Sequence, residues 1–498
     1  MAMELTPDFE TFAELAREYA LIPVCREIVA DLDTPLTLYH KLAAGERYSF
    51  LLESLEGGER WGRYSFIGWR PARLFHQEGG IIKIFRPGQA AETIRAADPL
   101  PALSRMMEKL RPAPVAGLPD FFGGAVGFFS FETVKAFEKI PNTVVADIGG
   151  ADAWFMVPGM LLVHDNLRHR LALVCLAEIG DDKSPETVAS AWRAALAELD
   201  GVVAKIRSPL DWLAPTPVCG PLGFKANMSK DDFLAMVARA VDYIRAGDII
   251  QVVLAQRFHC LEKLDPGAVY RALRLVNPSP YLFHFNFAGE RLIGSSPELL
   301  VRKNGAEIAV RPIAGTRPRG RDETEDRELA EELLADPKEV AEHIMLVDLG
   351  RNDIGRVSRC GRVRVEELMK IERYSHVMHI VSHVEGELRK GLDMFDVFRA
   401  CYPAGTVSGA PKIRALEIID ELEPTRRGPY AGAVGYFGFS GDMDFAITIR
   451  TVTVKDEVLY FQAGAGIVAD SRPEMEYQET INKASAMRRA LELAGRGW

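Results

Sequence analysis

The 498-residue sequence states one pattern twice, in the same order. An Ile-Gly pair with a proline three positions further on occurs at 67–71 and again at 293–297. GAVGFFSF at 124–131 returns as GAVGYFGF at 432–439. Two β-like apolar runs joined by a polar turn follow each GAVG copy, which is the pattern of a hairpin. Chance does not explain a shared order of marks, so we predict an internal duplication.

The remaining pattern predicts an α+β fold. Short apolar runs bounded by Gly, Pro and Asn fill 47–180 and are typical of strands. Amphipathic segments at 8–20, 101–111, 184–207 and 230–246 predict helices. We expect two intertwined halves around antiparallel β-sheets, with helices outside. The Pro- and Gly-rich stretch 208–223 is the expected connection between an N-terminal region, 1–207, and a C-terminal region, 224–498.

The two copies differ where chemistry is to be expected. Between the paired marks the second copy is longer, with 138 positions from Gly294 to Gly432 against 56 from Gly68 to Gly124. The extra length contains the segment 336–356, DPKEVAEHIMLVDLGRNDIGR. We therefore expect the second half to carry the chemistry and the first half to serve as scaffold or regulator.

That segment predicts a helix that starts at Pro337 and stops near Gly350. Glu339 and Glu342 are three residues apart and share one face with His343. A solvated acidic face is the plain alternative, because 319–342 is rich in charge. A second such pair near the C-terminus favours a function for both.

Glu476 and Glu479 again stand three residues apart, after Pro473 and a Ser471/Glu474 pattern that predicts a capping box. Two helices that each offer paired carboxylates can build an oxygen-ligand site for Mg²⁺, which takes one or two protein carboxylates and keeps water or substrate oxygens. Carboxylates left over could act as general acid or base.

Composition excludes several classes of protein. The formal net charge of −10 argues against a nucleic-acid surface, which needs a basic stripe. Six scattered cysteines without a CxxC pair indicate neither a zinc ribbon nor a disulfide framework. The acidic N-terminus has no signal-peptide core and no apolar run approaches a membrane span, so we expect a cytoplasmic protein that needs no membrane.

The glycines of AGAG, 463–466, could let backbone N–H groups approach an anion, or could simply pack within a strand. PAGTVSGAPK at 403–412 lacks the GK[ST] ending of a phosphate loop. Lys483 stands four residues after Glu479, so a salt bridge is its plain alternative to a role in binding.

Taken together, these motifs resemble the chorismate-utilising enzymes, and within them the anthranilate synthase component I branch. The resemblance covers nearly the whole chain and is strongest over 225–490. The motifs that carry it are LLES (51–54), GDIIQVVLAQR (247–257), NPSPY (277–281), IGSSPE (293–298), PIAGT (312–316), EHIMLVDLGRND (342–353), HVMHIVS (376–382), PAGTVSGAPK and AGAG.

The resemblance implies a Mg²⁺-dependent reaction in which chorismate is aminated by ammonia and then loses pyruvate to give anthranilate, the first step of tryptophan biosynthesis. No glutaminase nucleophile motif is present, so it implies a separate glutamine amidotransferase subunit. Relatives that use water carry a lysine at the position of Gln251, because water needs a base and ammonia does not. The aminodeoxychorismate branch has a nucleophilic lysine at the position of Ala314.

Carried onto this chain, the resemblance makes Glu342, Glu479 and the adjacent Glu476 the metal carboxylates. Glu339 is the implied acid for the departing C4 hydroxyl, and His379 belongs to the elimination of pyruvate. The implied substrate-binding residues are Gly315, Thr316, Thr406, Tyr430, Arg450, Gly464, Ala465, Gly466 and Lys483.

LLES and NPSPY resemble the site at which tryptophan inhibits the family. The implied contacts are Glu53, Ser54, Pro280, Tyr281 and Leu282. A strand edge packed on a turn would look the same in a single sequence. Two other functions stay open: an aminodeoxychorismate synthase component, and a non-catalytic regulatory subunit that binds chorismate or tryptophan. The retained carboxylates count against the latter.

Overall fold

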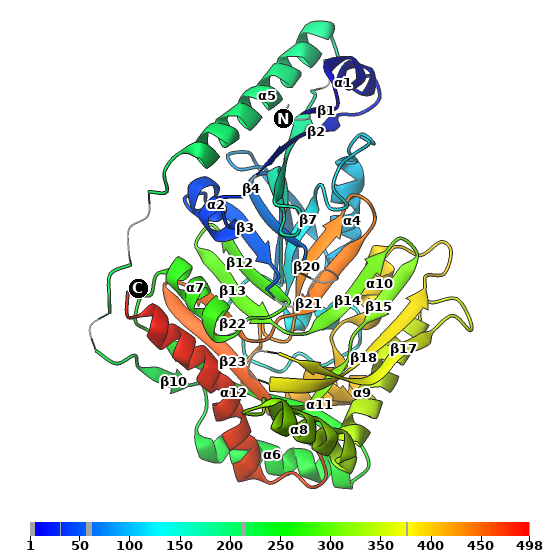
Figure 1. Ribbon diagram of the computed structural model, residues 1–498. Helices are drawn as coiled ribbons and strands as arrows, with labels where there is room; N and C mark the ends of the chain where they lie inside the picture. The colour runs from blue at the N-terminus through cyan, green and yellow to red at the C-terminus, as the bar shows by residue number, and fades with distance from the viewer. Residues whose placement is uncertain are drawn as a thin grey trace.

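A computed structural model describes residues 5–29, 31–55, 62–180, 182–211, 215–218, 220–374 and 377–497. The described strands join one hydrogen-bonded network in which every ladder is antiparallel, and helices cover its outside (Figure 1). The predicted α+β class, with two intertwined halves, is confirmed.

The elements up to the predicted connection are β1 (Leu5–Thr6), α1 (Phe9–Leu15), β2 (Leu21–Val29), α2 (Pro35–Leu42), β3 (Tyr48–Glu53), β4 (Tyr64–Glu78), β5 (Ile81–Phe85), β6 (Glu92–Arg95), α4 (Leu100–Lys109), β7 (Gly124–Phe129), η1 (Phe131–Ala136), β8 (Ala153–Asp165), β9 (Arg170–Glu178) and α5 (Pro185–Arg207). Those after it are β10 (Phe224–Ala226), α6 (Lys230–Arg245), β11 (Gln251–Cys260), α7 (Pro266–Val276), β12 (Tyr281–Phe287), β13 (Glu290–Ser296), β14 (Leu299–Asn304), β15 (Glu307–Val310), β16 (Ile313–Pro318), α8 (Glu323–Ala335), α9 (Pro337–Gly355), β17 (Arg364–Arg373), β18 (Val377–Glu387), α10 (Met394–Cys401), η2 (Gly405–Val407), β19 (Gly409–Ala410), α11 (Lys412–Leu422), β20 (Ala433–Gly438), β21 (Met443–Ile447), β22 (Thr451–Lys455), β23 (Val458–Ile467) and α12 (Pro473–Ala494).

The duplication appears directly in the strand pairing. Equivalent strands of the two copies pair with each other: β3 with β12, and β7 with β20. Outward from β3 the ladder runs through β4, β8, β9 and β2, and outward from β12 it runs through β13, β22, β23 and β11. In Figure 1 blue β3 lies beside green β12, and cyan β7 beside orange β20.

The glycine of each Ile-Gly mark makes room for a phenylalanine on the neighbouring strand. Gly68 stands opposite Phe50, and a Cβ at this position would lie 2.2 Å from the ring. Gly294 stands opposite Phe283, and its Cβ would lie 2.3 Å from that ring. A side chain cannot be added at such distances without moving the core. The repeated motif therefore records one packing solution used twice.

The hydrophobic core has two main parts, one on each face of the central strands. Because side chains alternate along a strand, Phe50 enters one cluster and its neighbour Leu51 enters the other. The first cluster also takes residues from α4, α6, α10 and α11, and the second takes residues from α2, α5, α7 and α12. The strands therefore form the layer between two sets of helices.

The helix boundaries follow the capping residues. α5 begins after Ser184, whose hydroxyl accepts the N–H of Thr187 at 3.3 Å, and α6 after Ser229, which caps Asp232 at 3.1 Å. The predicted helices at 184–207, 230–246 and 101–111 are thereby found nearly as expected. The predicted helix at 8–20 is only α1, with its N-cap at Asp8.

Two local predictions are wrong. The helix expected to stop near Gly350 continues to Gly355. Gly350 stands inside the helix because α9 packs closely on Val310 at this point: a Cβ at position 350 would lie 2.9 Å from the Val310 side chain. The capping box expected at Ser471 does not form. Arg472 is the N-cap of α12 without a side-chain bond, and the Ser471 hydroxyl accepts the N–H of Val468 at 3.0 Å instead.

The predicted connection 208–223 lies between α5 and β10, and its residues 212–214 and 219 fall outside the described part. The β3–β12 and β7–β20 ladders cross from the region 1–207 to the region 224–498. The two regions therefore share one sheet network, and their division of function stays a prediction. Among the described residues no helix is long and apolar enough to cross a membrane.

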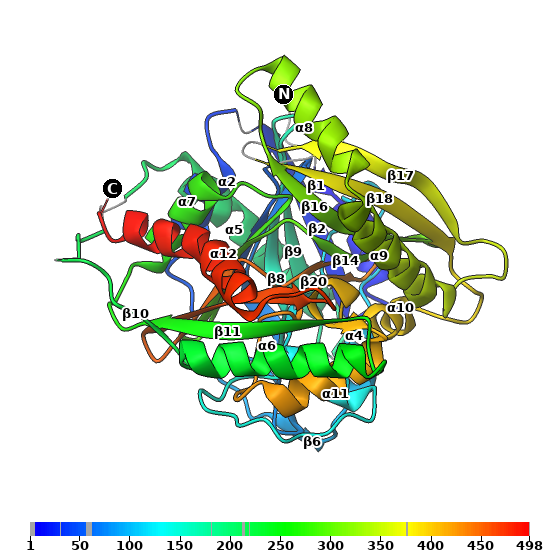
Figure 2. The same ribbon diagram turned by 90° about the horizontal axis from the view of Figure 1, so that it is seen from below.

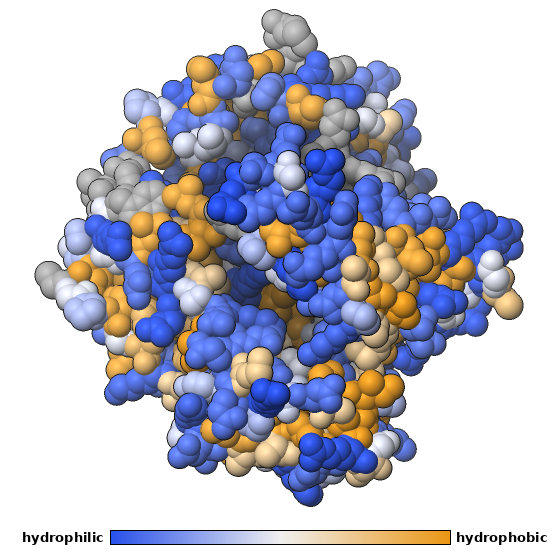
Figure 3. Space-filling view, turned by 60° about the horizontal axis from the view of Figure 1, so that its bottom comes forward, coloured by the Kyte–Doolittle hydropathy of each residue, from blue (hydrophilic) through white to orange (hydrophobic). Residues whose placement is uncertain are grey.

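The elements that carry the paired carboxylates sit at one end of the molecule. Seen from below (Figure 2), α12 runs beside β11 and α6, while α9 lies against β16 and β18. Charged and polar side chains cover most of the face in Figure 3, and this surface is hollowed near its centre.

Candidate active site

α9 presents its acidic face as its sequence predicts. Asp336 caps the helix and accepts the backbone N–H of Lys338 at 3.0 Å. His343, on the same face, is buried, and its Nε2 lies 2.6 Å from the hydroxyl oxygen of Ser382 on β18. This anchor fixes the rotation of the helix, so Glu342 is turned into the protein and half-buried.

Glu342 is the point at which the segments meet. The Gln251 amide donates to its carboxylate at 3.3 Å from the start of β11. Burial raises the pKa of Glu342, and the nearby negative charges of Glu339 and Glu479 raise it further. Carboxylates from α9 and from α12 therefore act on each other electrostatically.

α12 brings the second pair. Burial and the neighbouring Glu479 raise the pKa of Glu476. Glu479 forms an ion pair with Lys483 at 2.7 Å, and the Lys483 ammonium also donates to the Gly464 carbonyl at 3.0 Å. Lys483 and Glu479 keep about half of their side-chain surface in solvent. Such a pair contributes little to stability and can exchange partners at little cost.

The described residues contain no group of three or more His, Cys, Asp or Glu side chains arranged to hold a metal ion. That result does not conflict with Mg²⁺, which needs only one or two protein carboxylates. Glu342 and Glu479 offer two carboxylates, and a divalent cation between them would relieve their mutual repulsion. The chemistry of this donor set therefore fits the ion expected from the sequence.

The floor of the site is the β11–β23 ladder. Gly464 pairs with Ala255, and the Tyr430 hydroxyl would lie 2.9 Å from a Cβ at 464. Gly466 leaves similar room for the Gln251 amide, at 2.7 Å from its would-be Cβ. The two glycines thus make space for polar groups over an open backbone. Ala465 points to the opposite face and is fully buried in the core, so it can offer a ligand only its backbone.

β16 offers Nδ1 of His379 two partners at 3.0 Å, the Gly315 carbonyl and the Thr316 hydroxyl, and the carbonyl favours one tautomer. In the β16–β18 ladder His379 pairs with Thr316, and its Nδ1 lies 3.0 Å from the Gly315 carbonyl. A carbonyl only accepts, so Nδ1 carries the hydrogen and Nε2 keeps its lone pair. Burial is the main cause that lowers the pKa of His379, and nearby Arg450 lowers it too. The neutral ring is the form a base requires.

Glu298 is a site residue that the sequence reasoning missed. It lies between β13 and β14, is buried, and its pKa is raised to about 7 by that burial. The Thr406 hydroxyl and the charges of Arg450 and Lys483 oppose the rise. A cavity of about 40 Å³ extends from Glu298 and Thr406 to α9. A carboxyl group that is half-protonated near neutral pH, among predicted substrate residues, is a candidate acid.

Glu339 has a different environment. Its carboxylate forms an ion pair with Arg317 at 3.2 Å, and Arg317 also binds Asp336 at 3.0 Å. A would-be Cβ at Gly315 lies 3.1 Å from the Glu339 carboxylate, which places Glu339 beside β16. Glu339 is therefore engaged by Arg317 and would have to leave this partner to reach a substrate.

One signal in the sequence could have revealed Glu298. It follows the proline of the second Ile-Gly mark, where the first copy has Ala72. A carboxyl group that only the second copy carries, in the half expected to carry the chemistry, indicates a functional residue.

Arg450, by contrast, was predicted. It is fixed by a 2.8 Å bond to the Asn277 amide oxygen and holds a positive φ of 49°.

Strand pairing gathers the predicted tryptophan site. Glu53 at the end of β3 stands opposite Leu282 of β12, and the N–H of Leu55 donates to the Ser279 carbonyl at 3.3 Å. The five predicted residues therefore lie at one junction of the two halves: Glu53, Ser54, Pro280, Tyr281 and Leu282.

Within that junction the side chains divide between two faces. Glu53 is buried, accepts a hydrogen bond from the Tyr270 hydroxyl, and has its pKa raised mainly by burial. Tyr281 points to the other face and donates to Asp444 at 3.1 Å. The Glu53 carboxylate is thus already engaged by protein groups, Tyr270 and Arg274.

The chain is similar to known proteins along nearly its whole length. A family model described as "chorismate binding enzyme" matches residues 36–489. Anthranilate synthase component 1 from Aquifex aeolicus (strain VF5) is 45% identical over 501 residues, covering 99% of this chain and 99% of that protein. The Pseudomonas putida protein of the same name is 46% identical, covering 97% and 98%.

Among solved structures, the crystal structure of anthranilate synthase component I from Streptococcus pneumoniae TIGR4 matches with a TM-score of 0.76 and 38% identity, over 93% of this chain and 99% of that one. The chain therefore belongs to the chorismate binding enzymes. Within that family, it matches anthranilate synthase component 1 proteins along nearly their whole length, which confirms the resemblance inferred from the motifs.

Proposed function

We propose that this enzyme converts chorismate to anthranilate: Mg²⁺-dependent amination by ammonia, followed by elimination of pyruvate. The observation that carries the proposal is the meeting of Glu342 with Gln251 and Glu479 over the glycine floor of β23. Gln251 is neutral and cannot activate water, and Ala314 cannot form a covalent amine adduct. These two positions favour direct attack by ammonia over the reactions of the sister branches.

Glu342 and Glu479 would hold the Mg²⁺, with Glu476 beside them. When bound, the ion would bind the ring carboxylate of chorismate and polarise the ring. The chain itself would supply Arg450 and Lys483 for the remaining negative charge of the substrate. The Tyr430 and Thr406 hydroxyls and the exposed backbone of β23 would orient the ring between them.

In the first step ammonia adds to the ring and releases one proton to solvent, and the C4 hydroxyl leaves as water once it receives a proton. Glu339 was the predicted donor, but Arg317 engages it. Glu298 is buried, holds a proton up to about pH 7, and faces Thr406 and Arg450. We therefore favour Glu298 as the proton donor. Comparing Glu298→Gln with Glu339→Gln separates the two, because only loss of the true donor abolishes amination.

In the second step the aminated ring loses one proton and its enolpyruvyl ether, and becomes aromatic. Nε2 of His379 carries the lone pair that can take the ring proton, since Nδ1 is bound to Gly315. The enolpyruvate leaves with the C–O bonding electrons and takes up a proton to become pyruvate. The low pKa of His379 keeps it neutral at physiological pH.

The ammonia would come from a glutamine amidotransferase partner. The matched relatives are named component 1, which implies a second component for those proteins. Mixing the chain with a glutaminase subunit should replace ammonium salt by glutamine as the nitrogen source. Activity that requires ammonium salt in the presence of every candidate glutaminase would remove this part of the proposal.

Tryptophan would inhibit from the β3–β12 junction, where Leu55 bonds to Ser279. Inhibition from a separate site is allosteric, so tryptophan has to bind one conformational state better than the other. The junction joins the two halves of the duplicated sheet, so a shift there can reach both β23 and α9.

The decisive experiment incubates the purified chain with chorismate, Mg²⁺ and ammonium salt, and follows anthranilate by its fluorescence. Mg²⁺-dependent anthranilate supports the proposal. Turnover to a non-fluorescent aminated product would favour the aminodeoxychorismate branch, and binding without turnover would favour a regulatory subunit.

A further inference from the structure

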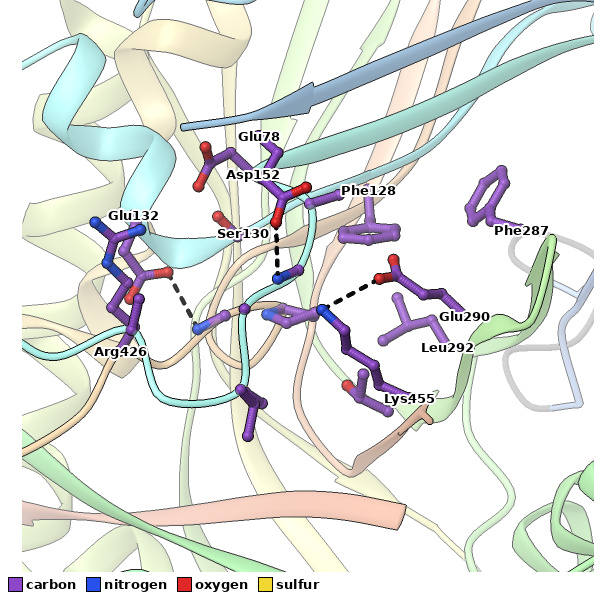
Figure 4. A pocket seen from close by; sticks show the side chains of 18 of the residues that line it. Glu78, Phe128, Ser130, Glu132, Asp152, Phe287, Glu290, Leu292, Arg426 and Lys455 are labelled. Carbon is purple, nitrogen blue, oxygen red and sulfur yellow. Dashed lines mark hydrogen bonds and ion pairs between the residues drawn. The ribbon is translucent and has the colours of Figure 1, made fainter. Parts of the chain in front are cut away.

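A cavity of about 150 Å³ lies apart from the candidate active site, and Figure 4 shows it from close by. It is bounded by the turn after β4, the end of β7, the loop 146–152, the β12–β13 hairpin, the segment 426–429 and β22. None of the predicted substrate, metal or tryptophan residues lines it. Its volume is that of a cavity that holds one benzene ring.

One side of this cavity is apolar. Phe128, Phe287, Leu292 and Pro429 line it. Phe287 is held from behind by Trp154, with ring centroids 4.9 Å apart and planes within 5° of each other. A flat apolar body can therefore lie against a wall that is rigid before it binds.

The other side carries an excess of carboxylates. Glu290 points inward and pairs with Lys455 at 3.5 Å, and Glu132 accepts the N–H groups of Arg427 and Gly428 at 2.8 and 3.1 Å. The adjacent Arg291 also lines the cavity, but strand alternation turns its guanidinium away, toward Tyr39 and His284.

Glu78 and Asp152 form no ion pair within the described part of the chain, although the charge of Arg426 acts on Asp152. Asp152 accepts the Gly79 N–H at 2.8 Å, and Glu78 accepts the Gly150 N–H at 3.4 Å. Both stand above the cavity in Figure 4, beside Ser130. Burial raises the pKa of Asp152 and the charge of Glu78 raises it further, while the Gly79 N–H and the charge of Arg426 lower it. A cation in the cavity would relieve both effects.

Ser130 is an independent sign of a missing ligand. It is 2% exposed and lines the cavity, and its hydroxyl has no hydrogen-bond partner among the described residues. Leaving a buried polar group unsatisfied costs free energy, so natural structures rarely do so without a reason. A donor placed beside Asp152 would satisfy this hydroxyl as an acceptor.

We propose that this cavity binds a small organic ammonium ion with a compact apolar body of about one ring. The body lies against Phe128 and Phe287, and the ammonium group donates to Asp152, Glu78 and the Ser130 hydroxyl. The inference does not rest on the proposed reaction, because it concerns a cavity that holds none of the residues assigned to that reaction.

The test is calorimetric titration of the whole chain, without chorismate, using benzylamine and its neutral analogue benzyl alcohol at about pH 7.5. We expect benzylamine to bind at least about tenfold more tightly, because a charge-assisted hydrogen bond in a buried site is worth at least that factor. Equal affinities, or no binding of benzylamine, would overturn the proposal.

Variants place the binding in this cavity. Asp152→Asn keeps an oxygen for the Gly79 N–H but loses the charge, and Ser130→Ala removes a hydroxyl that has no protein partner. Each should weaken benzylamine by about tenfold while leaving the thermal midpoint near that of the wild type. Glu457→Gln, which removes an exposed partner of Lys263 outside the cavity, is the matched control and should change nothing. Unchanged affinity in both cavity variants would refute the assignment.

Discussion

Replacing Glu298 by glutamine tests the buried acid most directly. The amide has the same shape as the carboxylic acid and keeps an oxygen toward Thr406, but it cannot ionise. Glu298 is buried, and its pKa in the folded protein is about 7 against 4.5 for an ordinary glutamate. A raised pKa means that folding favours the protonated form. Its contribution to stability is therefore complete below pH 4.5 and is lost as pH rises through 7.

The size of the effect follows from the shift. From 4.5 to about 7 is roughly two to three pKa units, and at about 1.4 kcal/mol per unit the wild type gives up about 3 kcal/mol of unfolding free energy between acid and alkaline pH. The glutamine variant gives up none of it. The variant should therefore match the wild type near about pH 4.5 and be more stable by about 3 kcal/mol at about pH 8.5.

The assay is denaturant unfolding of both proteins at several pH values, with anthranilate formation measured on the same samples. We expect the stability gain to come with a loss of about 10²- to 10⁴-fold in amination, the usual cost of removing a general acid. Glu339→Gln, at the partly exposed ion pair with Arg317, is measured in parallel for amination. Parallel stability curves for wild type and Glu298→Gln would refute the burial argument.

Three further predictions use the same protein. His379→Met should aminate chorismate but accumulate the aminated intermediate, seen by chromatography of the products; normal anthranilate output would exclude His379 from the second step. Glu342→Gln should remove the Mg²⁺ dependence of turnover and most of the activity, while Glu385→Gln, a carboxylate on β18 that binds His383, should keep both; a Glu342→Gln enzyme that still responds to Mg²⁺ as the wild type does would contradict the metal assignment. Ser54→Phe should abolish inhibition by tryptophan and spare turnover, measured as anthranilate formation over a tryptophan series; retained sensitivity would take Ser54 out of that site.

The duplication made much of the fold predictable. Because both copies need a glycine where Phe50 or Phe283 crosses, the same letters recur, and their order shows which strands are equivalent. Helix starts were predictable where a side chain caps them, as at Ser184 and Ser229. The pairing of β3 with β12 was not predictable, because no residue pattern in either strand indicates which distant strand it pairs with.

The site was predictable only as far as motifs reach. The carboxylates of α9 and α12 were found because spacing along a helix is visible in sequence. Burial raises the pKa of Glu298, and the groups that oppose the rise, Thr406, Arg450 and Lys483, stand far along the chain, so no local pattern reports their effect. The Arg317 contact that engages Glu339 was hidden for the same reason. Sequence therefore identified the paired carboxylates, but neither Glu298 nor the contacts that surround each carboxylate.

The missed end of α9 shows what tertiary contact does to a local rule, and it can be measured. Glycine in a helix costs about 1 kcal/mol relative to alanine, so alanine should stabilise an exposed site. At Gly355 a Cβ meets nothing within 4 Å, and we expect Gly355→Ala to raise the unfolding free energy by up to about 1 kcal/mol. At Gly350 the Cβ would lie 2.9 Å from Val310, and overpacking of about 1–3 kcal/mol should cancel or exceed the same gain. Denaturation midpoints compare the two directly. If Gly350→Ala proved as stable as Gly355→Ala, close packing against β15 would not be the reason that a glycine stands inside this helix.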